Sequence, residues 1–169
     1  MLELKIDAAS GEISGYASAF GGPPDSYGDI VRPGAFAKSL ASHRAGGTKP
    51  LMLWAHDPSE VPIGTWSEFR EDDFGLYVAG KLNLEIARGR EVHSALQAKS
   101  LAGLSIGFRT PPGGRVAAKG FYELREVELQ EISVVSFPAA KRARISATKS
   151  TSQDEQLKAA LAEIKAMHR

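Results

Sequence analysis

Two residues in this sequence could together hydrolyse a peptide or ester bond. Ser105 lies within "LAGLSIGF", residues 101–108, where its hydroxyl interrupts an apolar, glycine-flanked run. A serine hydroxyl is a weak nucleophile until a base takes its proton. His56 ends the apolar run "PLMLWAH", residues 50–56, and a strand end holds a side chain firmly while leaving it in reach of solvent. The pair predicts nucleophilic catalysis; the alternative is a buried serine bonded to the backbone.

A third group is needed to orient the imidazole and stabilise its charged form. Glu131 lies in "VELQEISVVSF", residues 127–137, where strand alternation puts it on one face with Ser133 and Val135. A carboxylate on an otherwise apolar face is costly unless it is paired, so Glu131 is the candidate. The alternative for Glu131 is a strand-edge charge in water. Asp57 competes for the role, but neighbours on a strand point to opposite faces.

The remaining histidines offer weaker alternatives. His43 lies at the polar end of an expected helix, and His168 stands next to the last residue. A metal hydrolase could draw on His43, His56, His93 and Asp57. No two histidines have the H-x-x-x-H spacing of a helical metal site, which disfavours that reading.

Composition narrows the class of protein. The chain has 169 residues, a formal net charge of +1 and no cysteine, which excludes disulfides and thiolate chemistry. The small net charge gives no sign of a nucleic-acid footprint or a membrane surface. No apolar run is long enough to span a membrane, and the N-terminus does not read as a secretory signal. We expect an intracellular protein.

The elements that must position these residues are mostly short strands. Alternating or continuously apolar segments separated by glycine and proline predict strands at 2–6, 12–20, 50–56, 63–69, 75–83, 104–110, 120–126, 127–137 and 143–147. Two helices are expected at 33–47 and from 87 to just before Gly103. The segment "DSYGDIVRPGAF" reads as a turn into the first helix, with Asp25, Asp29 and Pro33 structural.

The C-terminal segment differs in character. "SATKSTSQ" is small and polar like a linker, and residues 152–169 carry a capping box and one apolar stripe at helical spacing. The sequence therefore predicts one domain over 1–149, followed by a linker and an amphipathic helix over 150–169. We interpret that helix as a targeting or scaffold-docking element; the alternative is that it packs on the domain as ordinary structure.

Five blocks in order resemble the prohead (capsid maturation) serine proteases of tailed bacteriophages, a group related in fold to herpesvirus assemblin. The blocks span about residues 15–145 and are "GYASAF…DSYGDIVRPGAFAKSL", "LMLWAHDPSEVPIG", "EDDFGLYVAGKLN", "LAGLSIGF" and "LQEISVVSFPA". The resemblance implies an α+β fold, a mainly antiparallel β-barrel flanked by helices as in herpesvirus protease, with the C-terminal helix added.

By position, the resemblance puts the family's histidine on His56 and its nucleophile on Ser105. The third member is a histidine in the viral relatives, but no histidine lies between Ser105 and His168, and Glu131 stands at the matching place. The implied triad is therefore Ser-His-Glu. In the herpesvirus relatives an arginine helps the oxyanion hole, and Arg142 or Arg144 could do so here; a surface basic cluster is the alternative.

The resemblance also implies a function. It indicates an endopeptidase without cofactor or metal that cleaves scaffolding protein, or the scaffolding segment of the major capsid protein, and also itself. The implied place is inside the assembling procapsid in the bacterial host cytoplasm, with the major capsid and scaffolding proteins as partners and neither nucleic acid nor membrane. A homodimer or higher oligomer stays open. The rival function is a catalytically inactive scaffold or assembly protein of the same fold.

Overall fold

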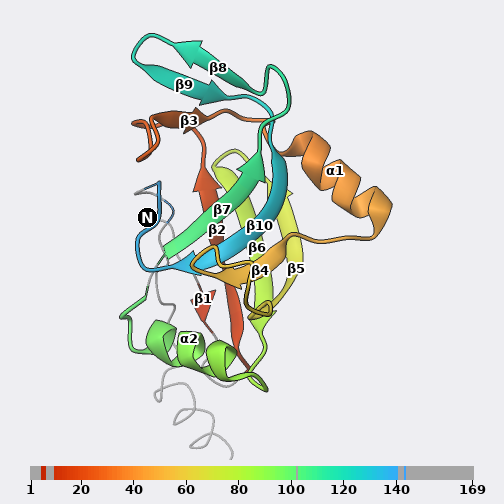
Figure 1. The fold of residues 1–169 in the computed structure, drawn as a ribbon, viewed down its shortest axis with the longest axis vertical. Coiled ribbons are helices and arrows are strands. Elements are labelled where there is room, and N and C mark those ends of the chain that lie inside the picture. The colour runs from red at the N-terminus through yellow and green to blue at the C-terminus, as the bar shows by residue number, and fades with distance from the viewer. Residues whose placement is uncertain (1–4, 7–9, 102, 141–142, 144–169) are drawn as a thin grey trace, which may run out of the picture.

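The computed structural model describes residues 5–6, 10–101, 103–140 and 143 (Figure 1). The described part is α+β, with two helices beside strands that are mostly short. The strands are β1 (Lys5–Ile6), β2 (Glu12–Ala19), β3 (Asp29–Val31), β4 (Leu51–Trp54), β5 (Gly64–Glu71), β6 (Gly75–Leu82), β7 (Gly103–Arg109), β8 (Arg115–Ala118), β9 (Phe121–Leu124) and β10 (Glu128–Val135). The helices are α1 (Ala37–Gly46) and α2 (Ala87–Gln97).

Seven strands form one curled, mixed sheet in the order β1-β2-β6-β5-β4-β10-β7. Most neighbours are antiparallel, but β4 and β10 run parallel, so the chain must cross over between them. β10 therefore lies between β4 and β7, the two strands that carry or adjoin His56 and Ser105 (Figure 1). β7, the last strand in this order, forms one edge of the sheet.

Three strands form a smaller sheet, β3-β9-β8, at one end of the molecule (Figure 1). β3 lies within residues 25–36, the segment that the sequence predicted as a turn into the first helix. At the start of this segment the Asp25 carboxylate accepts the backbone N–H groups of Tyr27 and Asp29. The sequence predicted neither β3 nor β8. β3 pairs in parallel with β9, and the buried Asp29 binds Arg115 of β8 at 2.8 Å. Such long-range pairing leaves no local pattern in the sequence, so these strands were missed. Asp29 is structural, as expected.

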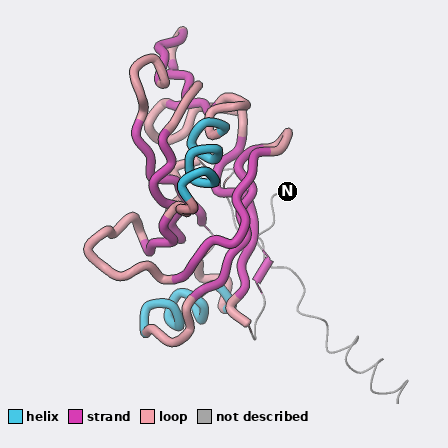
Figure 2. Tube along the Cα trace, turned by 90° about the vertical axis from the view of Figure 1, so that its right-hand side faces the viewer, coloured by secondary structure: helices cyan, strands magenta, loops and turns pink. Residues whose placement is uncertain are grey.

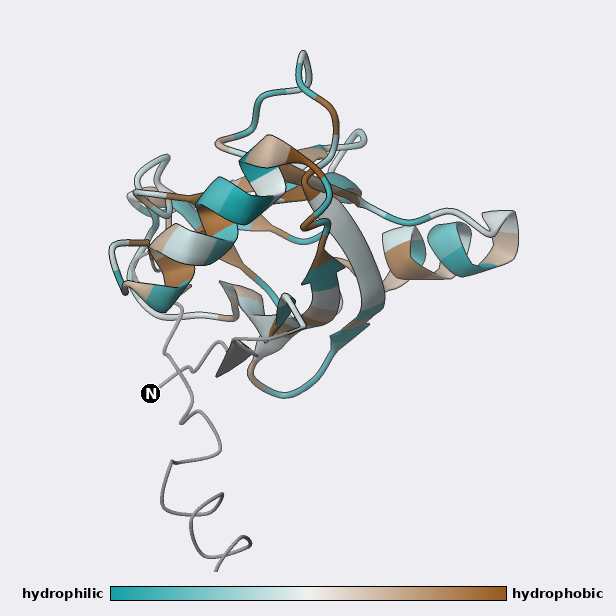
Figure 3. Ribbon diagram, turned by 90° about the horizontal axis from the view of Figure 1, so that it is seen from below, coloured by the Kyte–Doolittle hydropathy of each residue, from teal (hydrophilic) through white to brown (hydrophobic). Residues whose placement is uncertain are grey.

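The helices lie at separate places around the strands (Figure 2). α1 ends at Gly46, and Gly47 follows in the left-handed conformation, the ending that the glycine pair predicted. Phe36 and Leu40 are buried as expected, and Val92 and Leu96 give α2 its buried side. Both helices carry hydrophilic and hydrophobic residues, as surface helices do (Figure 3). None of the described helices is long and apolar enough to span a membrane.

The core lies on the inner face of the curled sheet. Its largest fully buried side chains are Trp66, Phe36, Ile13, Met52, Ile63, Leu76, Leu82, Leu96, Leu104, Leu124 and Ile132. All strands of the large sheet except β1 contribute to it, so β10 and its neighbours are held by apolar packing.

The predicted α+β class is confirmed, while the mainly antiparallel barrel is not. Within the described residues the pairing runs in open order from β1 to β7, and two of the strand pairs are parallel. The expected strand at 143–147 and the linker and helix at 150–169 lie outside the described residues, apart from Ala143, which is not in a strand.

Candidate active site

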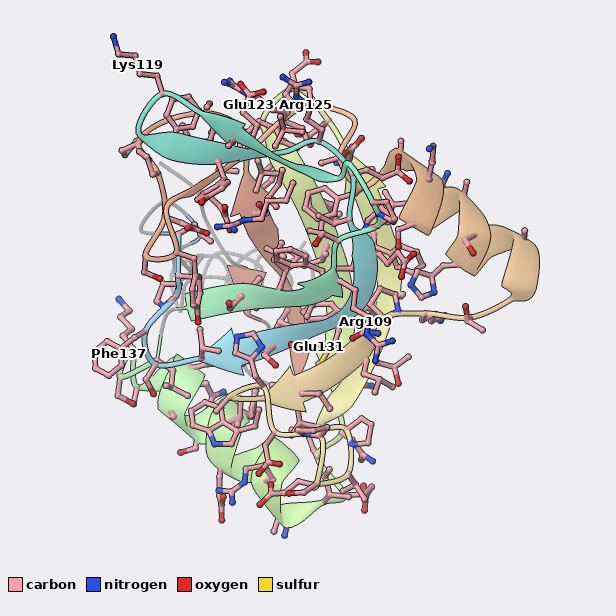
Figure 4. All side chains as sticks on the ribbon, turned by 45° about the horizontal axis from the view of Figure 1, so that its top comes forward. Arg109, Lys119, Glu123, Arg125, Glu131 and Phe137 are labelled. Atoms are coloured by element: carbon pink, nitrogen blue, oxygen red, sulfur yellow. The ribbon has the colours of Figure 1, made fainter. Side chains whose placement is uncertain are left out.

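Ser105 and Glu131 are brought together by strand pairing. In the antiparallel pair of β7 and β10, Ser105 lies opposite Ser133, and Gly107 lies opposite Glu131. Paired residues share a face, and so do alternate residues along one strand. The serine hydroxyl and the glutamate carboxylate therefore project from the same face of the sheet. Glu131 lies on β10 next to the end of β7, which is marked by Arg109 (Figure 4).

His56 reaches this face because the chain turns sharply after β4. The sequence predicted a strand through residue 56, but β4 ends at Trp54, and Ala55 and His56 have φ of 52° and 61°. Left-handed backbone at two successive non-glycine residues is strained and persists only when surrounding contacts impose it. Here Ala55 N–H donates to the Val134 carbonyl at 3.0 Å, and Asp57 N–H donates to the Trp54 carbonyl at 3.0 Å.

The imidazole of His56 is bonded to the carboxylate of Glu131. Nδ1–H donates to Oε1 in a short hydrogen bond, which leaves Nε2 as the nitrogen able to accept a proton. The bond to Glu131 raises the pKa of His56 above its ordinary value, against the lowering effect of burial. The His56 side chain is 41% exposed and that of Glu131 only 11%, so the carboxylate is the fixed partner.

Ser133 completes this arrangement, and sequence reasoning missed its role. Its hydroxyl donates to Glu131 Oε2 at 2.7 Å and accepts the His56 backbone N–H at 3.1 Å. Ser133 is fully buried, so both bonds form away from water. One side chain thus orients the carboxylate and holds the strained backbone of the histidine. Its place on the face of Glu131, two residues away, was the only signal in the sequence.

Gly107 provides the space that Glu131 occupies. A Cβ built on Gly107 would lie 2.1 Å from Glu131 Oε1, 2.7 Å from its Cδ and 2.8 Å from its Cγ. Any side chain at position 107 would collide with the carboxylate in its present place. The second glycine of "LAGLSIGF" therefore leaves the space in which the glutamate side chain of the neighbouring strand lies.

Ser105 and His56 line one cleft of about 1340 Å³. The cleft also borders the end of β2, the 21–29 loop region and Arg115 of the smaller sheet. Ser105 itself is 7% exposed. Among the described residues no hydrogen bond joins Ser105 to His56; such bonds are often long in unliganded enzymes and tighten with substrate.

The competing residues lie in other surroundings. The Asp57 carboxylate accepts hydrogen bonds from the N–H and the hydroxyl of Ser59. These bonds lower the pKa of Asp57 and hold its carboxylate within its own loop. His43 has both ring nitrogens bonded, to Thr48 Oγ1 and to the Leu129 carbonyl. Within the described ranges no three His, Cys, Asp or Glu residues gather as a metal site would require. Arg142 and Arg144 lie outside the described residues.

A serine, a histidine and a buried carboxylate on three adjacent segments have the residue types that acyl transfer requires, and the chain was compared with known proteins. The model of the family described as "Caudovirus prohead serine protease" matches residues 1–158. This chain belongs to that family. The membership implied by the five sequence blocks is thereby confirmed.

Individual relatives carry the same name. The chain is 37% identical to the prohead protease of Enterobacteria phage HK97 over 157 residues, which cover 88% of this chain and 65% of the relative. It is 28% identical to the prohead protease of Escherichia phage T5 over 149 residues, which cover 86% of this chain and 68% of that protein. The chain thus spans about two thirds of the length of these relatives.

A solved structure shows the same fold. The bacteriophage T4 capsid assembly protease gp21 superposes with a TM-score of 0.57, covering 82% of this chain and 97% of that one. At 12% identity the likeness concerns the fold alone. It supports the described α+β fold.

Proposed function

We propose that this family member is a serine endopeptidase of capsid maturation, with Ser105 as nucleophile, His56 as general base and Glu131 as the orienting carboxylate. The observation that carries the proposal is the bonded pair of His56 and Glu131 in the cleft that Ser105 lines. Family membership supports the reaction class, and the names of the relatives support the biological setting.

The proposed reaction follows from the geometry. Ser105 Oγ attacks the scissile carbonyl carbon while His56 Nε2 takes the hydroxyl proton, and the acyl-enzyme forms as His56 returns the proton to the leaving amine. Water then attacks the ester by the same route and releases the second product. Glu131 keeps Nδ1 protonated and stabilises the imidazolium that forms in each step.

The substrates we propose are the scaffolding protein or the scaffolding segment of the major capsid protein, inside the assembling procapsid in the host cytoplasm. The cleft has a volume of about 1340 Å³, above the usual range for small-molecule pockets, and it is bordered by several segments, so it has room for a stretch of polypeptide. Self-cleavage is part of the proposal. The small polar segment around residues 147–154 is the expected place, because proteases cut most readily at such segments.

The test combines a serine-directed acylating probe with a proteome-derived peptide library read by mass spectrometry. We expect the probe to label the wild-type protein with and without chelator, and both labelling and cleavage to disappear in Ser105→Ala. Chelator-sensitive cleavage would instead indicate a metal hydrolase. Neither labelling nor cleavage in the presence of its capsid proteins would favour the inactive assembly protein.

Self-cleavage is tested on the same samples. Mass spectrometry of aged wild-type protein should show trimming between about residues 147 and 154, and Ser105→Ala should stay intact. Trimming that is equal in both proteins would mean that another protease is responsible.

A further inference from the structure

The charged side chains of the cleft wall differ in whether they already have partners. Among the described residues, those that line the cleft and carry a charge, apart from the histidine, are Asp25, Asp29, Arg109 and Arg115. The Asp25 carboxylate accepts two backbone N–H groups of its own turn. Asp29 is buried and accepts from Arg115, whose guanidinium also lies over the ring of Tyr122, 3.7 Å from its centroid. Three of the four charges are therefore engaged within the protein.

Arg109 is the remaining charge of this wall. It is the last residue of β7 and is exposed, and its guanidinium makes no hydrogen bond or ion pair with any residue that the structure describes. Glu128 lies opposite it across the ladder and is exposed too, but the two side chains form no ion pair. A guanidinium carries five N–H donors in a planar fork. The cleft wall thus presents one cation whose donors are available to a ligand.

The register of β7 places this cation relative to the nucleophile. Alternate residues of a strand share a face, so Arg109 lies on the same face as Ser105 and Gly107. Four residues of a strand span about 13 Å. Gly107, between the other two, has no side chain, and the Glu131 carboxylate beside it is already bonded within the site. Arg109 is therefore separated from the nucleophile by a distance that an extended peptide covers in about four residues.

We propose that Arg109 determines specificity by binding an acidic side chain of the polypeptide substrate, about four residues from the scissile bond. The inference rests on the proposed protease function and adds a requirement on the substrate sequence. Aspartate and glutamate fit this place, because a guanidinium can bind a carboxylate through two parallel hydrogen bonds. A lysine or arginine there would be repelled, and a neutral residue would leave Arg109 in water. The acid thus selects which exposed bonds are cut.

The first test is a charge scan of the substrate. A decapeptide that spans a bond cut in the peptide library is changed, one position at a time and on both sides of the bond, to Asp, Asn or Lys. At one position about four residues from the bond, kcat/KM should be about fivefold higher for Asp than for Asn, the upper end for an exposed ion pair, and lowest for Lys. High salt should reduce this preference. Equal rates for Asp and Asn at every position would overturn the proposal.

The second test assigns the preference to Arg109. In Arg109→Ala the ratio of kcat/KM for the Asp peptide to that for the Asn peptide should fall to about one, and Arg109→Glu should favour the Lys peptide. The matched control is Lys119→Ala, which removes an exposed cation between β8 and β9, far from the labelled Arg109 (Figure 4). It should keep the wild-type ratio. A wild-type ratio in Arg109→Ala, or an equal loss in Lys119→Ala, would refute the assignment.

The third test measures binding apart from cleavage. Ser105→Ala holds peptides without cutting them, and fluorescence anisotropy should show that it binds the Asp peptide about fivefold more tightly than the Asn peptide. Adding Arg109→Ala should make the two affinities equal. Equal affinities already in Ser105→Ala would refute the role of Arg109. If the wild-type protein cuts no peptide at all, the protease function fails instead, so the two failures are distinguishable.

Discussion

Replacing Gly107 by alanine should lower the activity strongly, through a residue that has no side chain to take part in catalysis. The added Cβ would lie 2.1 Å from Glu131 Oε1, whereas ordinary van der Waals contact begins at 3.4 Å, so the carboxylate must move by about 1.3 Å. Rotation of the carboxyl group alone does not relieve the collision, because Cδ and Cγ of Glu131 are also within 3.0 Å of the new atom. The hydrogen bonds of Glu131 to His56 and Ser133 are then lost or distorted.

A misplacement of about 1 Å in the groups that support a catalytic residue costs about 10²-fold in rate. We therefore expect kcat/KM of Gly107→Ala to fall by about 10²-fold for a decapeptide that spans a bond cut in the peptide library. The matched control is Gly46→Ala in α1, where the nearest atom to a new Cβ is Thr48 Oγ1 at 3.7 Å; it should retain full activity. NMR of the His56 ring should show the Nδ1 proton protected from exchange with solvent by its bond to Glu131 in the wild type and not in Gly107→Ala.

A double-mutant cycle decides whether the effect passes through Glu131. If it does, Gly107→Ala adds little to the loss already caused by Glu131→Gln, because coupled residues are not additive. Folded Gly107→Ala with activity within twofold of wild type would refute the reasoning. The reasoning would also be refuted if the activity losses of the two single variants multiplied fully in the double variant, because the two substitutions would then act independently.

Four further outcomes are expected. Glu131→Gln should lower kcat by about 10⁴-fold, which is less than the ~10⁶-fold expected for loss of the nucleophile. Asp57→Asn should leave kcat unchanged. The opposite pattern would reassign the third residue of the triad to Asp57. Because Glu131 raises the pKa of His56, and the base acts only when neutral, the acidic limb of the kcat/KM profile should lie above the ordinary histidine pKa and move to lower pH in Glu131→Gln. Ser133→Ala should lower kcat about tenfold with KM nearly constant and shift that same limb, whereas a loss of thermal stability alone would indicate a merely structural serine. Deleting residues 150–169 should leave cleavage of the decapeptide within a few-fold of the full chain while weakening incorporation into procapsids; unfolding on deletion would show that the segment is part of the domain.

Much of this site could be predicted from the sequence because its main residues interrupt local patterns. Ser105 stands in an apolar run, His56 ends another, and Glu131 lies on a face that is otherwise apolar. From the pattern of residue types alone, each of these three residues also had a purely structural explanation. The order of the five sequence blocks favoured the interpretation as a protease. The two helices were predicted for similar reasons, from proline, glycine and apolar spacing.

The supporting features could not be predicted, because each depends on the register between distant strands. Gly107 matters only because Glu131 is its partner across the ladder. The left-handed backbone of His56 depends on bonds from Ser133 and Val134, roughly eighty residues away in the chain. β3 forms because β9 lies beside it, and nothing in residues 29–31 alone indicates that.

The central place of β10 also has a consequence for when activity can appear during synthesis. His56 and Glu131 are 75 residues apart, and the strand that joins their surroundings is the last one described in the chain. Contacts of such high sequence separation close late, because the entropy of closing long loops must first be overcome. A growing chain that already displays Ser105 and His56 still lacks the Glu131 carboxylate that bonds the imidazole and the Ser133 hydroxyl that bonds the histidine backbone. Ribosome-bound and partly folded molecules are therefore expected to be harmless to their neighbours until β10 inserts between β4 and β7.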